Sequence, residues 1–255
     1  MGFLSSLTEQ LKDSIGETIG LLKDQEPDTL PIQPPLSSTK SILPEQCEFF
    51  VQEKQISTSG EDYDIYFDED KPYLKVRGSK LSHIPGIDEI KIYEFEDDAS
   101  EEDEPKQIAK LKRKNDAIVI SRDTEKFFDS KKIAWIYQID DEEFNVYSDE
   151  DKENLIYKFE GDFIGRDIVM KNANNDEPVA KIDERTFTES NIMNCAAGVT
   201  GYDDVANTVG LDDVQSYDVK VAKGMDAVFA LICTIAIDEQ FDEVREAKRK
   251  EREEK

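Results

Sequence analysis

Residues 149–160, with the sequence DEDKENLIYKFE, place acidic side chains at the spacing of a calcium-binding loop. Carboxylates stand at the first, third, fifth and twelfth positions, where such loops hold their oxygen ligands. These residues are Asp149, Asp151, Glu153 and Glu160. Asn154 replaces the usual glycine, and asparagine tolerates the positive φ that this position needs. The flanks alternate as strands do, whereas the helix–loop–helix calcium motif needs helices. Two interpretations follow: a calcium site, or an acidic hairpin turn leading into a strand over residues 155–160.

Residue types that catalyse are scarce in this chain. His83 is its only histidine, and no nucleophile or carboxylate motif surrounds it. The sequence has no Gly-rich phosphate loop, paired metal-ligand motif or nucleophile elbow. Its many acidic pairs lie in polar runs, where a carboxylate lacks the burial that shifts a pKa. We therefore predict that the protein is not an enzyme, with calcium as the one cofactor that the sequence leaves open.

The N-terminus has two features that favour contact with a membrane. Gly2 and Ser6 match the N-myristoylation pattern, although the bulky Phe3 is unfavourable beside Gly2. Apolar residues recur at steps of three and four over residues 3–22, which predicts an amphipathic helix within residues 1–24. One acyl chain binds membranes only marginally, so the apolar face would supply the second signal. That face includes Phe3, Leu7, Leu11 and Ile15. The alternative is a helix that docks on the rest of the protein or on a partner.

Charge and cysteine content limit the partners and the compartment. The net charge is −27, from 59 acidic and 32 basic residues, which repels nucleic acid and anionic lipid. We therefore expect no nucleic-acid partner.

Three widely spaced cysteines, Cys47, Cys195 and Cys233, fit buried thiols in a reducing compartment better than disulfides. No secretory signal is evident at the N-terminus, so a cytoplasmic protein is expected.

The elements that would position these residues fall into four segments. After the arm of residues 1–24, five prolines among Ser and Thr predict a semi-rigid linker over residues 25–46. Residues 47–241 form the folded domain, and residues 242–255 a charged tail. We expect residues 1–46 and the acidic loop of residues 94–105 to be the least ordered parts.

The folded domain begins with a repeat of period two, typical of strands with one wet face. A long connection over residues 184–215 precedes the last of these strands. The twelve predicted strands are residues 49–57, 63–68, 73–78, 89–94, 107–112, 117–121, 132–137, 143–147, 155–160, 167–171, 178–183 and 216–222.

An apolar run, AVFALICTIAI, occupies residues 227–237, and Thr234 is its only polar residue. The run is too short for a membrane span, and a helix that is apolar all round must be buried on every side. A soluble chain meets that demand with a closed barrel around the helix. Ala230 and Ala236 would mark close approaches of the helix to the wall. The expected inward neighbours are Leu74, Val76, Ile90, Ile92, Trp135, Val219 and Val221.

Over residues 47–241 the chain resembles the LURP-one-related branch of the tubby C-terminal-like superfamily, which also contains the phospholipid scramblases. The resemblance rests on FFVQEKQIS, YDIYF, KPYLKV, EIKIYEF, PVAKIDE and SYDVKVAKGMDAVFALICTIAIDE, in that order. It implies an all-β fold: a closed twelve-stranded antiparallel β-barrel around a buried C-terminal hydrophobic helix, over residues 225–241.

The resemblance implies less about activity. Tubby proteins tether to membranes through phosphoinositides, scramblases are tied to lipid movement and calcium, and plant LURP-one proteins are linked to defence. This chain lacks the Cys-rich palmitoylation run of scramblases. Its one compact basic cluster, the candidate head-group patch, is Lys110, Lys112, Arg113 and Lys114.

We therefore predict a non-enzymatic binding or scaffold protein with an unidentified protein partner, and peripheral membrane contact through the N-terminal arm. The alternative is a scramblase-like phospholipid-handling protein with calcium at residues 149–160.

Overall fold

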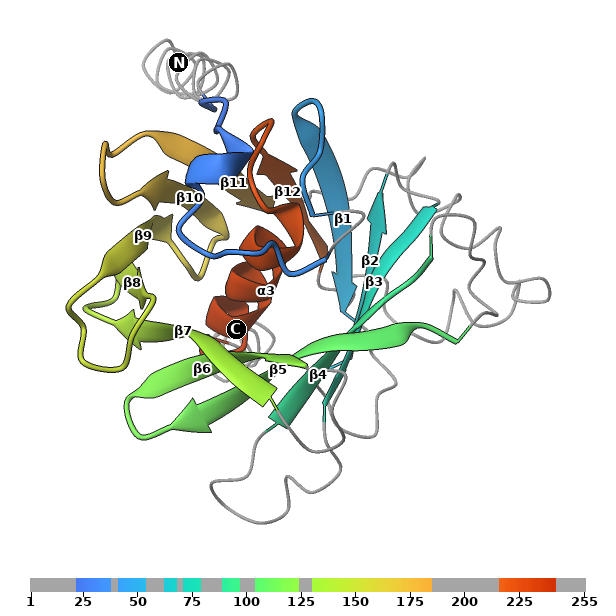
Figure 1. Cartoon of the computed structure of the whole chain (residues 1–255), viewed down its shortest axis with the longest axis horizontal. Coiled ribbons are helices and arrows are strands. Elements are labelled where there is room, and N and C mark those ends of the chain that lie inside the picture. Colours follow the sequence, from blue (N-terminus) through green and yellow to red (C-terminus); the bar gives the residue numbers. More distant parts are fainter. Residues whose placement is uncertain are drawn as a thin grey trace, which may run out of the picture.

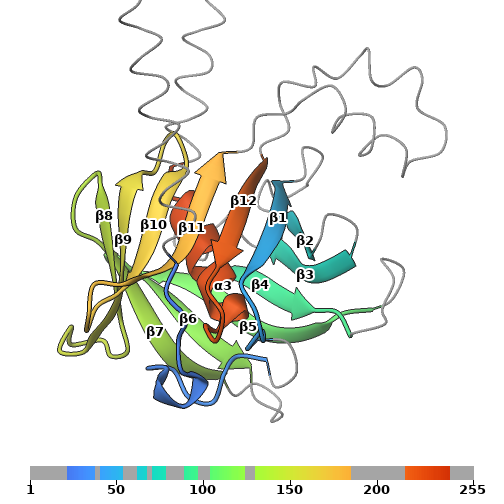
Figure 2. The same ribbon diagram turned by 90° about the horizontal axis from the view of Figure 1, so that it is seen from above.

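The computed structural model describes residues 22–37, 41–53, 62–67, 71–78, 89–96, 104–123, 130–184 and 216–241. They form a closed barrel with a helix, α3, inside it (Figures 1 and 2). A short 3₁₀ helix, η1 (Pro27–Thr29), precedes the barrel. The strands are β1 (Cys47–Glu53), β2 (Tyr63–Phe67), β3 (Lys71–Gly78), β4 (Glu89–Glu94), β5 (Lys106–Lys114), β6 (Ala117–Asp123), β7 (Ser130–Gln138), β8 (Glu143–Tyr147), β9 (Leu155–Asp162), β10 (Asp167–Asn172), β11 (Pro178–Glu184) and β12 (Ser216–Val221).

Each strand pairs antiparallel with its neighbours in sequence, and β1 pairs with β12 to close the ring. The predicted twelve-stranded antiparallel barrel is thus confirmed. The closing register joins Cys47 to Val221 and Val51 to Tyr217. Because side chains alternate across each strand, this register gives every strand one face toward the interior and one toward solvent.

The interior is filled by α3 (Ala227–Asp238), all twelve residues of which are buried. Asp226 caps its N-terminus, since its carboxylate accepts a hydrogen bond from the Phe229 backbone N–H at 2.9 Å. Within residues 227–237 the only polar side chain is that of Thr234, whose hydroxyl donates to the Ala230 carbonyl oxygen at 2.9 Å. The prediction of a buried axial helix is confirmed, with bounds inside the expected residues 225–241.

A buried ion pair holds the C-terminal end of α3 against the turn between β9 and β10. The Arg166 guanidinium donates to both carboxylate oxygens of Asp238, each at 3.0 Å. Both side chains are almost fully buried. A carboxylate at a helix C-terminus is unfavourable beside the helix dipole, and the paired guanidinium offsets that cost.

The predicted inward side chains lie in one core cluster with α3, except for Trp135. Trp135 belongs to a second cluster on the outer face, with Ala117, Val119 and Tyr137, and Tyr147 packs against it. Its neighbour Ile136 points inward instead. The prediction for Trp135 was wrong because residues 133–137, IAWIY, are apolar on both faces, so alternation there could not indicate the inner one.

The Pro-rich segment is packed rather than merely connecting. Residues 22–37 and 41–46, which we call the strap, cross the end of the barrel at the start of α3 (Figure 2). Leu30, Ile32 and Leu36 are buried in the main core. The Leu36 backbone N–H donates to the Asp226 carboxylate at 2.9 Å, and the Ala227 N–H donates to the Ser41 carbonyl oxygen at 2.7 Å. The expectation that residues 25–46 act as a poorly ordered linker is therefore corrected for the strap.

Three expected segments lie outside the described residues: most of the N-terminal arm, the acidic loop at residues 97–103 and the connection at residues 185–215. The charged tail from residue 242 does so as well. In the part of the chain that is described, no helix is both long and apolar enough to cross a membrane.

Candidate functional site

The acidic segment of residues 148–154 is a tight hairpin turn between β8 and β9. The Asp149 carboxylate accepts hydrogen bonds from the backbone N–H groups of Glu153 and Asn154, at 3.0 and 2.9 Å. These bonds lower the pKa of Asp149. Asn154 was expected to adopt a positive φ, but the residue of this turn that does so is Lys152, at 60°. Asp149 therefore holds its own turn together, as the hairpin interpretation predicts.

The four proposed calcium ligands are not brought together. Glu160 lies down β9 opposite Glu143, whereas the turn begins where Tyr147 pairs with Leu155. The Glu160 carboxylate forms an ion pair with Lys171 at 2.7 Å. Across the described ranges, no group of three or more His, Cys, Asp or Glu side chains could hold a metal ion.

The basic cluster of β5 divides between the two faces of its strand. Lys110, Lys112 and Lys114 alternate with Leu111 and Arg113, so the lysines point outward while Arg113 points to the barrel end. Lys114 forms an ion pair with Glu150, which raises the pKa of Lys114. The four residues therefore do not form one patch.

Cations from separate strands instead line up across the outside of the barrel. Arg77 of β3 faces Lys91 of β4, and Lys91 faces Lys110 of β5. Lys110 faces Ser121 of β6, which in turn faces Lys132 of β7. We call Arg77, Lys91, Lys110 and Lys132 the basic row. The compact cluster in sequence pointed to Lys110 alone, because the other members only become neighbours through strand register.

The centre of the basic row has no compensating acid among the described residues. Arg77 lies 3.4 Å from an Asp64 carboxylate oxygen, and Lys132 lies 3.9 Å from one of Glu150. No ion pair joins Lys91 or Lys110 to any other residue in the described ranges. Like charges directly opposite in a sheet are destabilising. Three other lysines of the wall do have a carboxylate within reach: Lys171 pairs with Glu160, Lys181 with Asp183 and Lys220 with Glu48.

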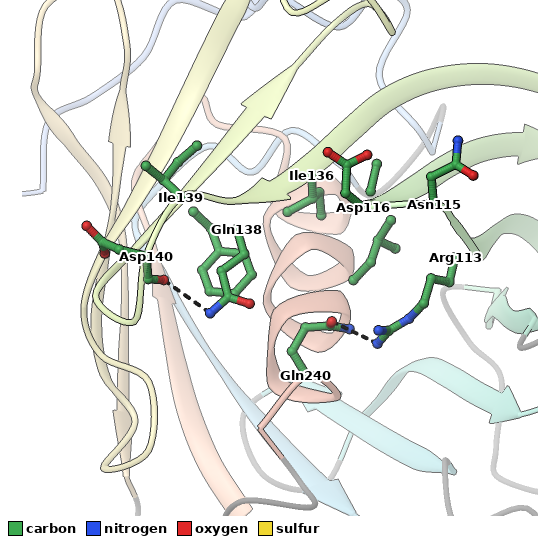
Figure 3. Close-up of a pocket in the computed structure, with 11 residues that line it drawn as sticks. Arg113, Asn115, Asp116, Ile136, Gln138, Ile139, Asp140 and Gln240 are labelled. Carbon is green, nitrogen blue, oxygen red and sulfur yellow. Dashed lines mark hydrogen bonds between the residues drawn. The ribbon is translucent and has the colours of Figure 1, made fainter. Parts of the chain in front are cut away.

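A pocket of about 460 Å³ lies at the end of the barrel where α3 finishes (Figure 3). We call it the mouth pocket. Its residues come from the β5–β6 turn, the end of β7 with the turn that follows, the start of β8 and the residues after α3. They are Arg113, Asn115, Asp116, Ala117, Ile118, Ile136, Gln138, Ile139, Asp140, Phe144 and Gln240.

The mouth pocket has an apolar floor and a polar rim. Ile118, Ile136 and Phe144 form the floor and belong to the main core. On the rim, the Arg113 guanidinium donates to the Gln240 side-chain oxygen at 2.7 Å (Figure 3). Ile139 is 50% exposed, the only large hydrophobic side chain of the described residues that is exposed. Sequence reasoning missed this pocket, since its residues meet only when the barrel closes around α3.

The remaining predicted site residues lie outside the described residues. These are Gly2, Phe3, Leu7, Leu11 and Ile15 of the arm, and also His83.

Comparison with known proteins identifies a family and a fold. The model of the LURP-one-related family matches residues 47–238. The chain is also similar to an X-ray structure of a protein from Arabidopsis thaliana, at 11% sequence identity and a TM-score of 0.50. That similarity covers 78% of this chain and 94% of the Arabidopsis chain, and at this identity it shows the fold alone. A comparison with curated protein sequences gives no match.

Proposed function

Because the chain belongs to the LURP-one-related family, we propose that it is a non-enzymatic binding protein that engages its partner through the outside of the barrel. The barrel interior is occupied by α3, every residue of which is buried. A barrel of this kind has its space filled by its own side chains and offers a partner its outer wall and its ends. The two reduced cysteines that the structure describes, Cys47 and Cys233, are buried and support a cytoplasmic location.

The basic row carries this proposal. In a protein of net charge −27, three cations stand on adjacent strands, and the two directly opposed pairs of like charge lower the stability of the wall. A glutamate at Lys91 or at Lys110 would relieve the repulsion. We infer that the row is kept for a bound acidic partner, whose carboxylates would neutralise it.

A slender acidic protein segment fits the row better than an extended anionic surface. Four inter-strand steps separate Arg77 from Lys132, a span of about 19 Å at roughly 4.8 Å a step. An extended peptide covers that span with about six residues. An extended anionic surface would bring many other charges within a Debye length of this strongly acidic protein, and would be repelled.

The test uses one substitution that separates binding from stability. Lys110→Glu would place a carboxylate opposite Lys91, so the variant should be as stable as the wild type or more stable by a few tenths of a kcal/mol. Its affinity for a labelled glutamate-rich peptide should fall about three- to tenfold, since an exposed pair turns from attraction to repulsion.

Lys158→Glu is the matched control. Lys158 also faces a lysine, Lys171, but on β9 and β10, and Lys171 already has Glu160 as a partner. Peptide binding by this variant should stay at the wild-type level and weaken with added salt as the wild type does. Equal losses in the two variants, or no peptide binding by the wild type, would refute the row as the contact surface.

A peripheral membrane contact is the second candidate, favoured by the amphipathic pattern of residues 3–22 and by Gly2. Its binding would depend on Phe3, Leu7, Leu11 and Ile15, and added salt would leave it unchanged or strengthen it by screening the repulsion. Flotation with anionic vesicles, using the full chain and a form lacking residues 1–21, tests this candidate. Binding that survives the deletion and weakens steeply with salt would move the lipid contact to the basic row.

A further inference from the structure

We propose that the mouth pocket binds a small carboxylate with an apolar body, a ligand class independent of the partner of the basic row. Two independent properties of the pocket lead to this ligand. A cationic side chain on the rim can bind a carboxylate, and a preformed apolar floor lies below it. Its volume of about 460 Å³ falls within the range of small-molecule sites.

Arg113 is this cationic side chain, and we call it the anchor. Its guanidinium is held by the Gln240 side-chain oxygen at 2.7 Å, a neutral acceptor that orients the group without neutralising it. No ion pair joins Arg113 to a carboxylate anywhere in the described residues. A planar guanidinium with free N–H groups matches a carboxylate in geometry as well as in charge, and forms paired hydrogen bonds with it.

The acids on the rim do not compete for this charge. An Asp116 carboxylate oxygen lies 3.4 Å from the Lys152 ammonium, and Asp140 accepts a hydrogen bond from the Glu142 backbone N–H at 2.8 Å. Both carboxylates therefore have partners of their own. With Asp116 paired to Lys152, the remaining charges of the rim are those of Arg113 and Asp140, which lie on opposite sides of the pocket in Figure 3. A ligand carboxylate would therefore bind at Arg113, away from Asp140.

The floor favours an apolar body. Ile118, Ile136 and Phe144 are packed into the core beside α3, and Phe144 contacts Phe163 with ring centroids 4.9 Å apart. These side chains are held before any ligand arrives, so a bound ligand need not order them. At the rim, the exposed Ile139 offers apolar surface that the ligand would cover.

The experiment uses phenylbutyrate as the probe, with phenylbutyramide and phenylbutylamine as neutral and cationic analogues of the same body. Amide NMR shifts of the full chain should move on adding phenylbutyrate, and those shifts should be centred on residues 113–118 and 136–140. The amide analogue should bind at least about tenfold more weakly, because it lacks the charge-assisted bond to Arg113. The amine should not bind.

Two variants test the anchor against its immediate neighbour. Arg113→Gln should weaken phenylbutyrate binding at least about tenfold and remove the preference over the amide. Lys112→Gln removes the adjacent charge on the opposite face of the same strand and should leave both unchanged. Both positions are exposed, so both variants should fold as the wild type does. Ile139→Ala should weaken binding a few-fold without changing that preference.

Three results would overturn the proposal: no shift with phenylbutyrate, equal binding of the acid and the amide, or equal loss in the Arg113 and Lys112 variants. None of them bears on the basic row, because Lys110→Glu leaves the mouth pocket intact. The two proposals therefore fail separately.

Discussion

Replacing Gly224 by alanine is expected to loosen the strap from the barrel. Gly224 precedes the cap of α3 and has a φ of 77°, a conformation that costs an L-residue about 1–2 kcal/mol. A Cβ at this position would lie 1.8 Å from the Gln25 carbonyl oxygen and 2.8 Å from its carbon. Ordinary contact begins at 3.4 Å, so the backbone of the strap must move away.

The size of the effect follows from the bonds that such a movement would break. The Gln25 N–H donates to the Lys223 carbonyl oxygen at 2.8 Å, and the Lys23 N–H donates to the Pro178 carbonyl oxygen at 2.9 Å. Each backbone bond contributes about 1 kcal/mol. Together with the conformational cost, Gly224→Ala should lower the free energy of unfolding by roughly 3–4 kcal/mol. In a domain of this size that corresponds to a fall in Tm of roughly 6–16 °C.

Urea denaturation and limited proteolysis would measure both parts of this effect. The wild-type strap should resist cleavage at residues 25–37, and the variant should be cut there before the barrel is. Gly165→Ala is the matched control, since its Cβ would meet only the end of the Asp162 side chain, at 2.5 Å, and Gly165 does not have positive φ. It should cost about 1 kcal/mol. The reasoning fails if Gly224→Ala is no less stable than the control, or if its strap stays protected.

Leu231→Asp should unfold the domain, because an unpaired carboxylate buried on all sides costs several kcal/mol against a total stability of about 5–15 kcal/mol. Circular dichroism with Leu231→Met as the volume-conserving control tests this, and a soluble Asp variant with a cooperative melt would contradict a helix enclosed by the barrel. Burial raises the pKa of Asp226 above its usual value of 3.8, so the folded state holds that proton more tightly than the unfolded state. This stabilisation is complete below about pH 4 and is lost as the pH rises through the raised pKa, so the stability of the wild type relative to Asp226→Asn should fall over that window in urea titrations. A difference that is constant with pH, or that grows, would be evidence against it.

The barrel and its helix were predictable because two independent sequence patterns indicate the same fold. The wet and dry faces of the strands alternate with period two, and residues 227–237 have no face that water could cover. Each strand pairs with its sequence neighbours, so no long-range pairing beyond ring closure had to be inferred. Trp135 was misplaced where both faces of β7 are apolar and the alternation carries no information.

The strap was not predictable from composition. Proline, serine and threonine at residues 25–46 satisfy the usual signature of a linker. Its backbone groups find their partners only on the finished barrel, as when the Leu36 N–H meets the Asp226 carboxylate, far along the chain. Asp226 thus serves two roles, capping α3 and holding the strap, and only its place before an apolar run was visible in sequence.

The basic row and the mouth pocket could not be found from sequence for a related reason. Lys91 and Lys110 are neighbours only in one register, and a slip of one residue would turn either side chain to the opposite face. The compact run at residues 110–114 suggested a single patch, but alternation sends Arg113 to the pocket and its neighbours to the outer wall. The cluster in sequence therefore indicated the correct strand, β5, but wrongly placed Arg113 in one patch with the lysines.

The closed ring also fixes where the N-terminal arm joins relative to the basic row. The Lys23 backbone N–H donates to the carbonyl oxygen of Pro178, at the start of β11. Around the ring, β11 lies six strands from β5 in either direction. The basic row is centred near β5, so the arm and the row start from opposite sides of the barrel. A partner held on the row would therefore leave the attachment point of the arm, at Lys23, uncovered. If both proposed contacts exist, the barrel is a rigid spacer between them, and simultaneous binding of the acidic peptide and of anionic vesicles should be no weaker than either alone.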